Sequence, residues 1–297
     1  MEYVSPEAVI DITAPEVSFQ SNGNTNPAQT QSTIVGVIDD ITGVKTAKYS
    51  RTETQSCNSA TTSFSSGDTI SKTTGDGVRY LCVYAEDMVG NSGYTLSEAF
   101  TLDNTSPEII SLTFVPDDPG YKIGGTVTAT LVINETGSVT STGWEAEEDG
   151  KTFTKVFNAN TTEALHFQDI AGNTSSTGFQ ITWLDNTAPY VISGGLIYSP
   201  ETFTSGNVLA QIITNRPILK PAGWSGLDFA ISFSKRYENN IDETITLDDN
   251  AGNTGSQVIT INRIDRAAPE IQSVTYDPAL TNKPVTITVT AVDQASE

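Results

Sequence analysis

The sequence predicts an all-β chain built from repeated two-sheet domains. Three observations predict this fold class: strands that alternate apolar and polar side chains, a short phrase that recurs along the chain, and the lack of a long helical period. Residues 78–87, 125–134 and 256–265 show the alternation most clearly. This pattern is typical of strands that are covered on one face only, so we expect sheets that pack face to face.

The recurring phrase begins with an acidic turn and ends with an aspartate shortly before a proline. Its copies occupy residues 85–107, 167–189 and 247–268. The two aspartates of each copy lie 16 residues apart: Asp87 and Asp103, Asp169 and Asp185, and Asp249 and Asp265. A fixed short interval inside repeats of variable length indicates one structural unit whose remaining loops tolerate insertions.

The closing aspartates also mark the predicted domain boundaries, since a further closing phrase, VIDITAP, contains Asp11. We expect the last strand of a preceding repeat, three complete domains and the first strands of a truncated fourth domain. Their ranges are 1–10, then 11–102, 103–184 and 185–264, and finally 265–297. About seven short strands per repeat, separated by turn signals, predict tandem Greek-key β-sandwiches of immunoglobulin type in an elongated array.

The charge of the chain limits its partners. Lys and Arg number 15 and Asp and Glu number 36, which gives a formal net charge of −21. This charge argues against nucleic acid and anionic membrane surfaces, and cations are the natural counterpart. No apolar run approaches the roughly 18 residues of a transmembrane helix, so we expect no membrane insertion in this segment.

The repeated motif carries a resemblance. D-x-A-G-N-[ST], followed by a strand and then [VIL]-D-x-[TA]-[AS]-P, resembles the bacterial Ig-like tandem repeats of large surface adhesins, and the likeness covers nearly the whole chain. Two departures are MVGN after Asp87 and the segment IDRAAP around Asp265. The resemblance implies an extracellular, cell-surface location and calcium at domain junctions.

The geometry of such a sandwich brings acidic groups together at each junction. The linker, the loop after the second strand and the turn between the last two strands meet at one pole of the domain. The loop of the third junction offers only Asn215, which Arg216 follows. The candidate metal ligands are Asp11, Asp39 or Asp40, and Asp87 at the first junction, Asp103, Glu135 and Asp169 at the second, and Asp185 and Asp249 at the third.

Crowded carboxylates repel one another unless a cation offsets their charge. Ca²⁺ prefers carboxylate, amide and carbonyl oxygens, whereas a set without His or Cys excludes a dedicated zinc or copper site. We therefore predict Ca²⁺ as the bound cofactor. Ordinary turn chemistry is a compatible alternative, because an Asp followed by Gly or Asn accepts local backbone N–H groups without any metal.

The remaining chemistry points away from catalysis. We expect Cys57 and Cys82 to form a disulfide, and His166 has no Ser and Asp arrangement around it. A catalytic pair has no reason to recur once per repeat, so we expect no enzymatic activity. We predict a stalk segment of an adhesin or fibre, whose partners are the adjoining repeats and a host or neighbouring-cell protein or glycan. Alternatives are a self-assembling surface-layer or filament protein, and a glycan- or protein-binding module centred on residues 49–68.

Overall fold

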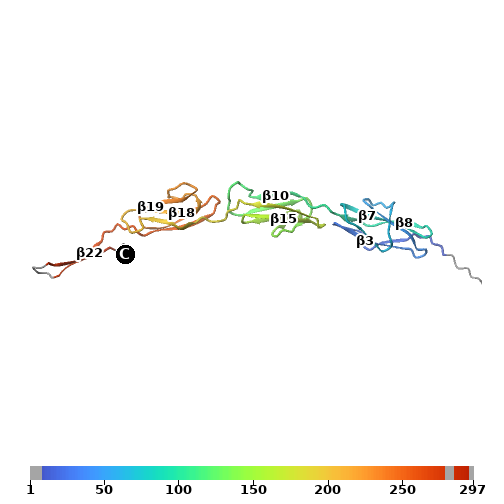
Figure 1. Ribbon diagram of the computed structural model, residues 1–297, viewed down its shortest axis with the longest axis horizontal. Helices are drawn as coiled ribbons and strands as arrows, with labels where there is room; N and C mark the ends of the chain where they lie inside the picture. Colours follow the sequence, from blue (N-terminus) through green and yellow to red (C-terminus); the bar gives the residue numbers. More distant parts are fainter. Residues whose placement is uncertain (1–8, 278–283, 294–297) are drawn as a thin grey trace, which may run out of the picture. The chain divides into compact units, whose positions relative to one another are not determined.

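The computed structural model describes residues 9–277 and 284–293, and this part of the chain is all-β (Figure 1). Strands are joined by turns and loops, with no helix in the described ranges. Accordingly, the described chain contains no helix long and apolar enough to cross a membrane. The predicted all-β fold class is confirmed. The strand expected at 1–10 falls mostly outside the described residues, as do parts of the expected fourth domain.

The chain divides into two compact units, which we describe separately. One comprises Met1–Val115, Thr128–Val156 and Thr162–Gln180, and the other comprises Pro116–Val127, Phe157–Thr161 and Ile181–Glu297. The domain boundaries expected from the sequence repeats remain predictions.

The first repeat is a sandwich of two sheets in the first unit. One sheet has the strand order β1 (Glu16–Phe19), β3 (Gln31–Ile38) and β6 (Asp68–Lys72). The other has the order β2 (Asn24–Ala28), β9 (Phe100–Leu102), β7 (Gly77–Asp87), β4 (Val44–Thr52) and β5 (Thr62–Ser63), with β8 (Ser92–Leu96) also paired to β7. Val35 and Ile70 of the first sheet pack in one buried cluster with Leu81 and Val83 of the second. The alternating side chains of β3 and β7 thus supply the core, as expected for half-covered strands.

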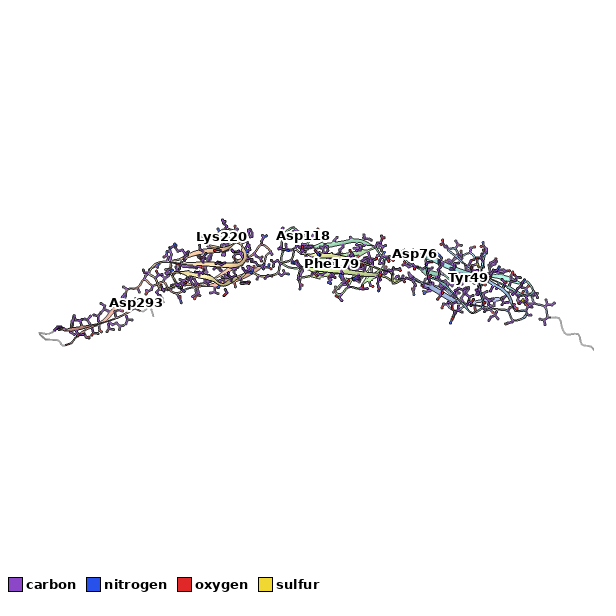
Figure 2. All side chains as sticks on the ribbon, viewed as in Figure 1. Tyr49, Asp76, Asp118, Phe179, Lys220 and Asp293 are labelled. Atoms are coloured by element: carbon purple, nitrogen blue, oxygen red, sulfur yellow. A yellow bond between two sulfur atoms is a disulfide. The ribbon has the colours of Figure 1, made fainter. Side chains whose placement is uncertain are left out.

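A second pair of sheets follows, and its core also lies in the first unit. One sheet has the strand order β10 (Ile109–Val115), β11 (Val127–Ile133), β14 (Thr152–Phe157) and β13 (Glu145–Ala146). The other has the order β12 (Gly137–Val139), β15 (Thr161–Asp169) and β16 (Thr174–Ile181). Leu131 and Phe153 pack against Leu165 and Phe167 in its core. Phe179, labelled in Figure 2, lies with its ring centroid 5.3 Å from that of Phe114.

The second unit repeats this construction. One sheet has the strand order β17 (Val191–Ser199), β18 (Val208–Ile218) and β19 (Ala230–Tyr237). The other pairs β20 (Ile241–Asp248) with β21 (Thr254–Ile261). Trp224 is buried in the cluster that joins these sheets. Farther along, β22 (Glu270–Asp277) and β23 (Thr286–Val292) form an antiparallel hairpin.

Each repeat ends with the same parallel backbone contact. Leu102 of β9 pairs with Ala28 of β2, and the isolated parallel bridges Ile123 with Leu184 and Thr204 with Ile264 stand at corresponding places. The amide of each following linker aspartate donates to this partner: Asp103 to Ala28 (3.1 Å), Asp185 to Ile123 (2.8 Å) and Asp265 to Thr204 (2.9 Å). The linker aspartates therefore have equivalent backbone positions.

Candidate metal centre

The turn between the last two strands of the first repeat fixes its aspartate by local hydrogen bonds. Asp87 Oδ1 accepts the backbone N–H groups of Val89 (2.9 Å), Gly90 (2.6 Å) and Asn91 (2.8 Å). Gly90 has a φ of 98°, which lies in the left-handed region where glycine is favoured. Asp87 is fully buried, and although this burial alone would raise its pKa, the hydrogen bonds from Asn91, Val89 and Gly90 outweigh it and lower the pKa. The turn role that the sequence predicts is present.

An asparagine four residues after each turn aspartate ties that turn to the linker. Its Nδ2 donates both to the carboxylate of the turn aspartate and to the backbone carbonyl of the linker aspartate. These two distances are 2.7 and 3.2 Å for Asn91, 2.8 and 3.1 Å for Asn173, and 3.0 and 2.8 Å for Asn253. This role was not predicted from the sequence, although an asparagine closes each D-x-x-G-N phrase.

The first acidic cluster consists of Asp11, Asp39 and Asp87. Each of the three offers one carboxylate oxygen, and these oxygens lie within 4.8 Å of one another. Thr42 Oγ1 donates to Asp11 Oδ2 (2.8 Å), which orients the linker carboxylate. Asp40 is exposed and stands outside this cluster. Of the two aspartates considered at this loop, the structure therefore brings Asp39 to the cluster.

The second acidic cluster consists of Asp103, Glu135 and Asp169. Its three carboxylate oxygens also lie within 4.8 Å of one another, and Asp169 is buried. Burial and the negative charges of Asp103 and Asp169 raise the pKa of Glu135. Burial is the largest cause of this shift, and the two neighbouring carboxylates add to it while Lys151 opposes it.

Both clusters fit a hard divalent cation. Two oxygens that bind one Ca²⁺ at about 2.4 Å each can be at most about 4.8 Å apart, which is the limit that both clusters satisfy. Each cluster draws one acid from the linker, one from the loop after the second strand and one from the acidic turn. A set made only of carboxylates, without His or Cys, has the ligand chemistry of Ca²⁺ rather than zinc.

The third junction has a different arrangement. Arg216 Nη1 lies 2.7 Å from Asp185 Oδ2 and 3.3 Å from Asp249 Oδ2. Burial alone would raise the pKa of Asp249, but hydrogen bonds from Asn253, Ala251 and Arg216 outweigh it and lower the pKa. The two carboxylates expected to hold a metal ion thus hold a guanidinium in this structure.

The backbone register shows which residue of the third junction corresponds to Glu135. In each repeat, the residue five positions after the linker aspartate pairs with a residue in or directly after a long antiparallel strand. These pairs are Glu16 with Ile38, Glu108 with Asn134, and Tyr190 with Asn215. The residues that follow are Asp39, Glu135 and Arg216, and they occupy equivalent positions. Arg216, rather than Asn215, therefore replaces the loop acid.

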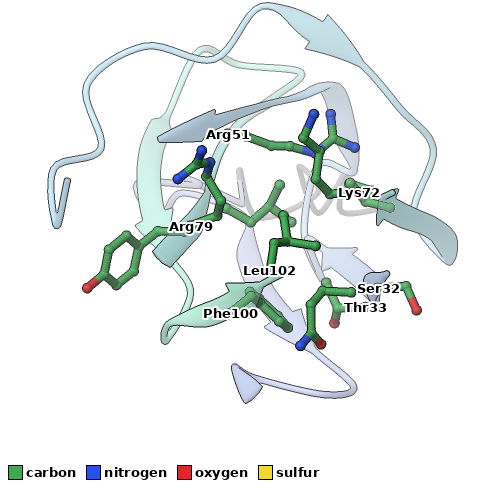
Figure 3. A pocket seen from close by; sticks show the side chains of 11 residues that line it. Ser32, Thr33, Arg51, Lys72, Arg79, Phe100 and Leu102 are labelled. Atoms are coloured by element: carbon green, nitrogen blue, oxygen red, sulfur yellow. The ribbon is translucent and has the colours of Figure 1, made fainter. Parts of the chain in front are cut away.

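The other candidate residues do not form a site. Cys57 and Cys82 form a disulfide that ties the loop after β4 to strand β7. His166 is exposed on β15, and its backbone carbonyl accepts the N–H of Thr140 (2.9 Å). A pocket in the first repeat is lined by Arg51, Lys72 and other residues shown in Figure 3. Its cavity volume of about 30 Å³ is small, with room for about two or three water molecules.

No protein-family model matches this chain, and no curated protein sequence matches it. Several solved structures are similar to it. One is SGBP-B of the Bacteroides ovatus mixed-linkage glucan utilization locus, in complex with a mixed-linkage heptasaccharide: 15% identity, 93% of this chain and 76% of that chain covered, TM-score 0.23. Another is a Ca²⁺-stabilized adhesin that helps an Antarctic bacterium bind ice. The two are 17% identical over 84% of this chain and 73% of the adhesin chain, with a TM-score of 0.35. A third is the Escherichia coli adhesin FdeC, which is 15% identical over 85% of this chain and 98% of the FdeC chain, with a TM-score of 0.26.

Proposed function

We propose that this chain is an extracellular stalk segment of a bacterial surface adhesin or fibre, whose Ig-like repeats are stiffened by Ca²⁺ at domain junctions. The observation that carries this proposal is the convergence of Asp103, Glu135 and Asp169 from three distant segments, matched by Asp11, Asp39 and Asp87 in the preceding repeat. The likeness of the repeated motif to bacterial Ig-like adhesin repeats supports the adhesin part of the proposal.

The linker aspartate explains why an ion here has a mechanical effect. Asp11 and Asp103 belong to the linker segments, whereas the other acids of each cluster belong to loops of the following sandwich. An ion held by both would fix the linker to the domain and restrict hinging. It would stabilise the folded domain by about 2.7 kcal/mol when free calcium is in hundredfold excess over Kd.

The same arrangement argues for a structural rather than a catalytic use of the carboxylates. They recur at equivalent positions of successive repeats, and Asp87 and Asp169 are buried within hydrogen-bonded turns. We therefore assign no enzymatic activity to the chain. Reach would grow with the number of repeats, because each unit of such an array contacts only its neighbours.

Calcium titration of purified protein tests this proposal. We expect calcium to raise the melting temperature and EDTA to reverse the change, and we expect EDTA to broaden the interdomain distances measured by small-angle scattering. The variant Asp103→Asn should bind less calcium than the unchanged chain. Identical melting curves in millimolar calcium and in EDTA would refute the calcium part of the proposal.

A second candidate function is a binding module for a glycan or protein on a host or neighbouring cell. The observation that favours it is the loop after β4, which the Cys57–Cys82 disulfide holds against strand β7. A covalently fixed loop loses less conformational entropy on binding a partner. Glycan-array binding by the unchanged chain, lost when residues 53–61 are replaced by a short Gly/Ser linker, would favour this function over a plain stalk.

A further inference from the structure

We propose that Arg216 is a built-in cation that takes the place of calcium at the third junction, so that this junction closes without metal. The inference rests on the proposed function in treating the other two clusters as calcium sites. Its starting point is the register described above, in which Arg216 occupies the position of Asp39 and Glu135. The third repeat therefore carries a positive charge at the position where the other two repeats carry a candidate ligand.

The charges of the clusters explain the different occupants. The first and second clusters each bring three carboxylates together, with a formal charge of −3 when all are ionised. The third has the carboxylates of Asp185 and Asp249 and the guanidinium of Arg216, with a formal charge of −1. A divalent cation would lose one carboxylate ligand there and would face a fixed positive charge a few ångströms away, where like charges repel strongly.

The guanidinium makes the contacts that the ion would otherwise make. Its Nη1 contacts a linker carboxylate, Asp185, and a turn carboxylate, Asp249, and so it joins the same two segments. The Asp249 side chain is 4% exposed, and the Arg216 side chain is 23% exposed. Charge-assisted hydrogen bonds that are partly shielded from water are stronger than exposed surface ion pairs.

Direct backbone contacts in the second unit accompany this ion pair. Gly124 N donates to Ala251 O at 2.6 Å, and Ala251 lies in the same turn as Asp249. A Cβ atom at Gly124 would meet Ala251 O at 2.9 Å, so the approach requires glycine. Asn186, next to Asp185, donates from Nδ2 to Gly125 O (2.9 Å) and accepts from Gly125 N (2.6 Å). Protein groups thus connect the linker and the turn at the third junction.

The consequence is a chain with two kinds of junction. Withdrawal of calcium would loosen the linkers at Asp11 and Asp103, while the linker at Asp185 would keep its hydrogen bonds. High salt would weaken the third junction only modestly, because partly buried ion pairs are screened much less than exposed ones.

A reciprocal charge swap tests the inference. Calcium bound per chain is measured by equilibrium dialysis with radioactive calcium, for the unchanged chain and for Arg216→Glu, Glu135→Arg, Asp185→Asn and Asp103→Asn. We expect Arg216→Glu to bind one more ion than the unchanged chain and Glu135→Arg to bind one fewer. Asp103→Asn should lose calcium, whereas Asp185→Asn should lose none. A loss of bound calcium in Asp185→Asn would overturn the inference.

A second measurement separates this inference from the proposed function. In EDTA, a double-mutant cycle on the melting temperature of the unchanged chain, Arg216→Met, Asp185→Asn and the double variant measures the coupling between the two side chains. We expect the second substitution to cost little once the first has been made. Additive effects would refute the role of Arg216. If the unchanged chain binds no calcium at all, the proposed function fails, and the cycle still decides whether Arg216 closes this junction.

Discussion

Asn173 Nδ2 donates to the backbone carbonyl of Asp103 at 3.1 Å and to Asp169 Oδ2 at 2.8 Å, across 70 residues of sequence in the first case. This one amide therefore joins the acidic turn of the second repeat to the linker that precedes it. Because the amide is part of the protein, the connection exists with or without a metal ion.

The first prediction concerns this amide. Asn173→Ala should lower the free energy of unfolding by about 1–3 kcal/mol in both calcium and EDTA, because a buried carboxylate loses a donor and a carbonyl is left without its partner. Chemical denaturation in the two buffers measures the change. Asn173→Asp is the matched variant, since it keeps the shape, removes the donor and adds a charge beside Asp169. A destabilisation seen in calcium only would assign Asn173 to the metal site rather than to the turn.

The second prediction uses two neighbouring aspartates. Asp39 lies in the first acidic cluster, and Asp40 is exposed beside it. Asp39→Asn should therefore weaken calcium binding and reduce the calcium-induced rise in melting temperature, because it removes one of three charged ligands. Asp40→Asn changes the net charge equally and should leave both quantities unchanged. Isothermal titration and thermal melting check this, and equal effects of the two variants would contradict a site centred on Asp39.

The all-β fold was predicted from the sequence because it depends on local patterns. The same patterns predicted that acidic residues gather at the first two junctions, with the choice between Asp39 and Asp40 left open at the first. Alternating strands such as β7 and β11 specify which side chains form the core, and the constant 16-residue phrase specifies that turn and linker recur together. An immunoglobulin-type topology then brings the linker, the loop and the turn to one pole. Asp103, Glu135 and Asp169 meet there as expected.

The third junction could not be predicted in the same way. The sequence offered Asn215 and Arg216 in a row, and the choice of which residue faces the cluster depends on strand register, which a shift of one residue reverses. The pairing of Tyr190 with Asn215 decides it and leaves Arg216 to contact Asp185. Asp39 and Asp40 posed the same question, and the pairing of Glu16 with Ile38 answers it.

The third prediction concerns the disulfide between Cys57 and Cys82, which are separated by 25 residues. Replacing both by alanine should lower the free energy of unfolding of the first repeat by about 3.5 kcal/mol, because the unfolded chain regains the entropy of an open loop of this length. Urea denaturation of the full chain, monitored by circular dichroism, measures this loss. A destabilising substitution in the second repeat shifts only the transition of that repeat, and so it identifies which transition belongs to the first. Reduction of the unchanged chain should give the same loss. No shift in either experiment would contradict a stabilising disulfide.

The fourth prediction follows from the raised pKa of Glu135. A carboxyl whose pKa is higher in the folded than in the unfolded chain favours folding in its protonated form, and this advantage is lost as pH rises through the folded pKa. At neutral pH the charged Glu135 therefore opposes folding of the calcium-free protein. Glu135→Gln should therefore raise the melting temperature in EDTA at pH 7. In calcium buffer the same substitution should lower the calcium affinity, and with it the calcium-induced rise in melting temperature.

The pH dependence provides the control for Glu135→Gln. In EDTA, its stabilising effect relative to the unchanged chain should shrink as pH falls through the pKa of Glu135, because protonation removes the same charge. Melting temperatures measured from about pH 4 to about pH 7 check this, because glutamate titrates in roughly this range. A gain in stability that does not change over this range would show that the substituted amide acts through packing, and a loss of stability in EDTA at pH 7 would contradict repulsion among Asp103, Glu135 and Asp169.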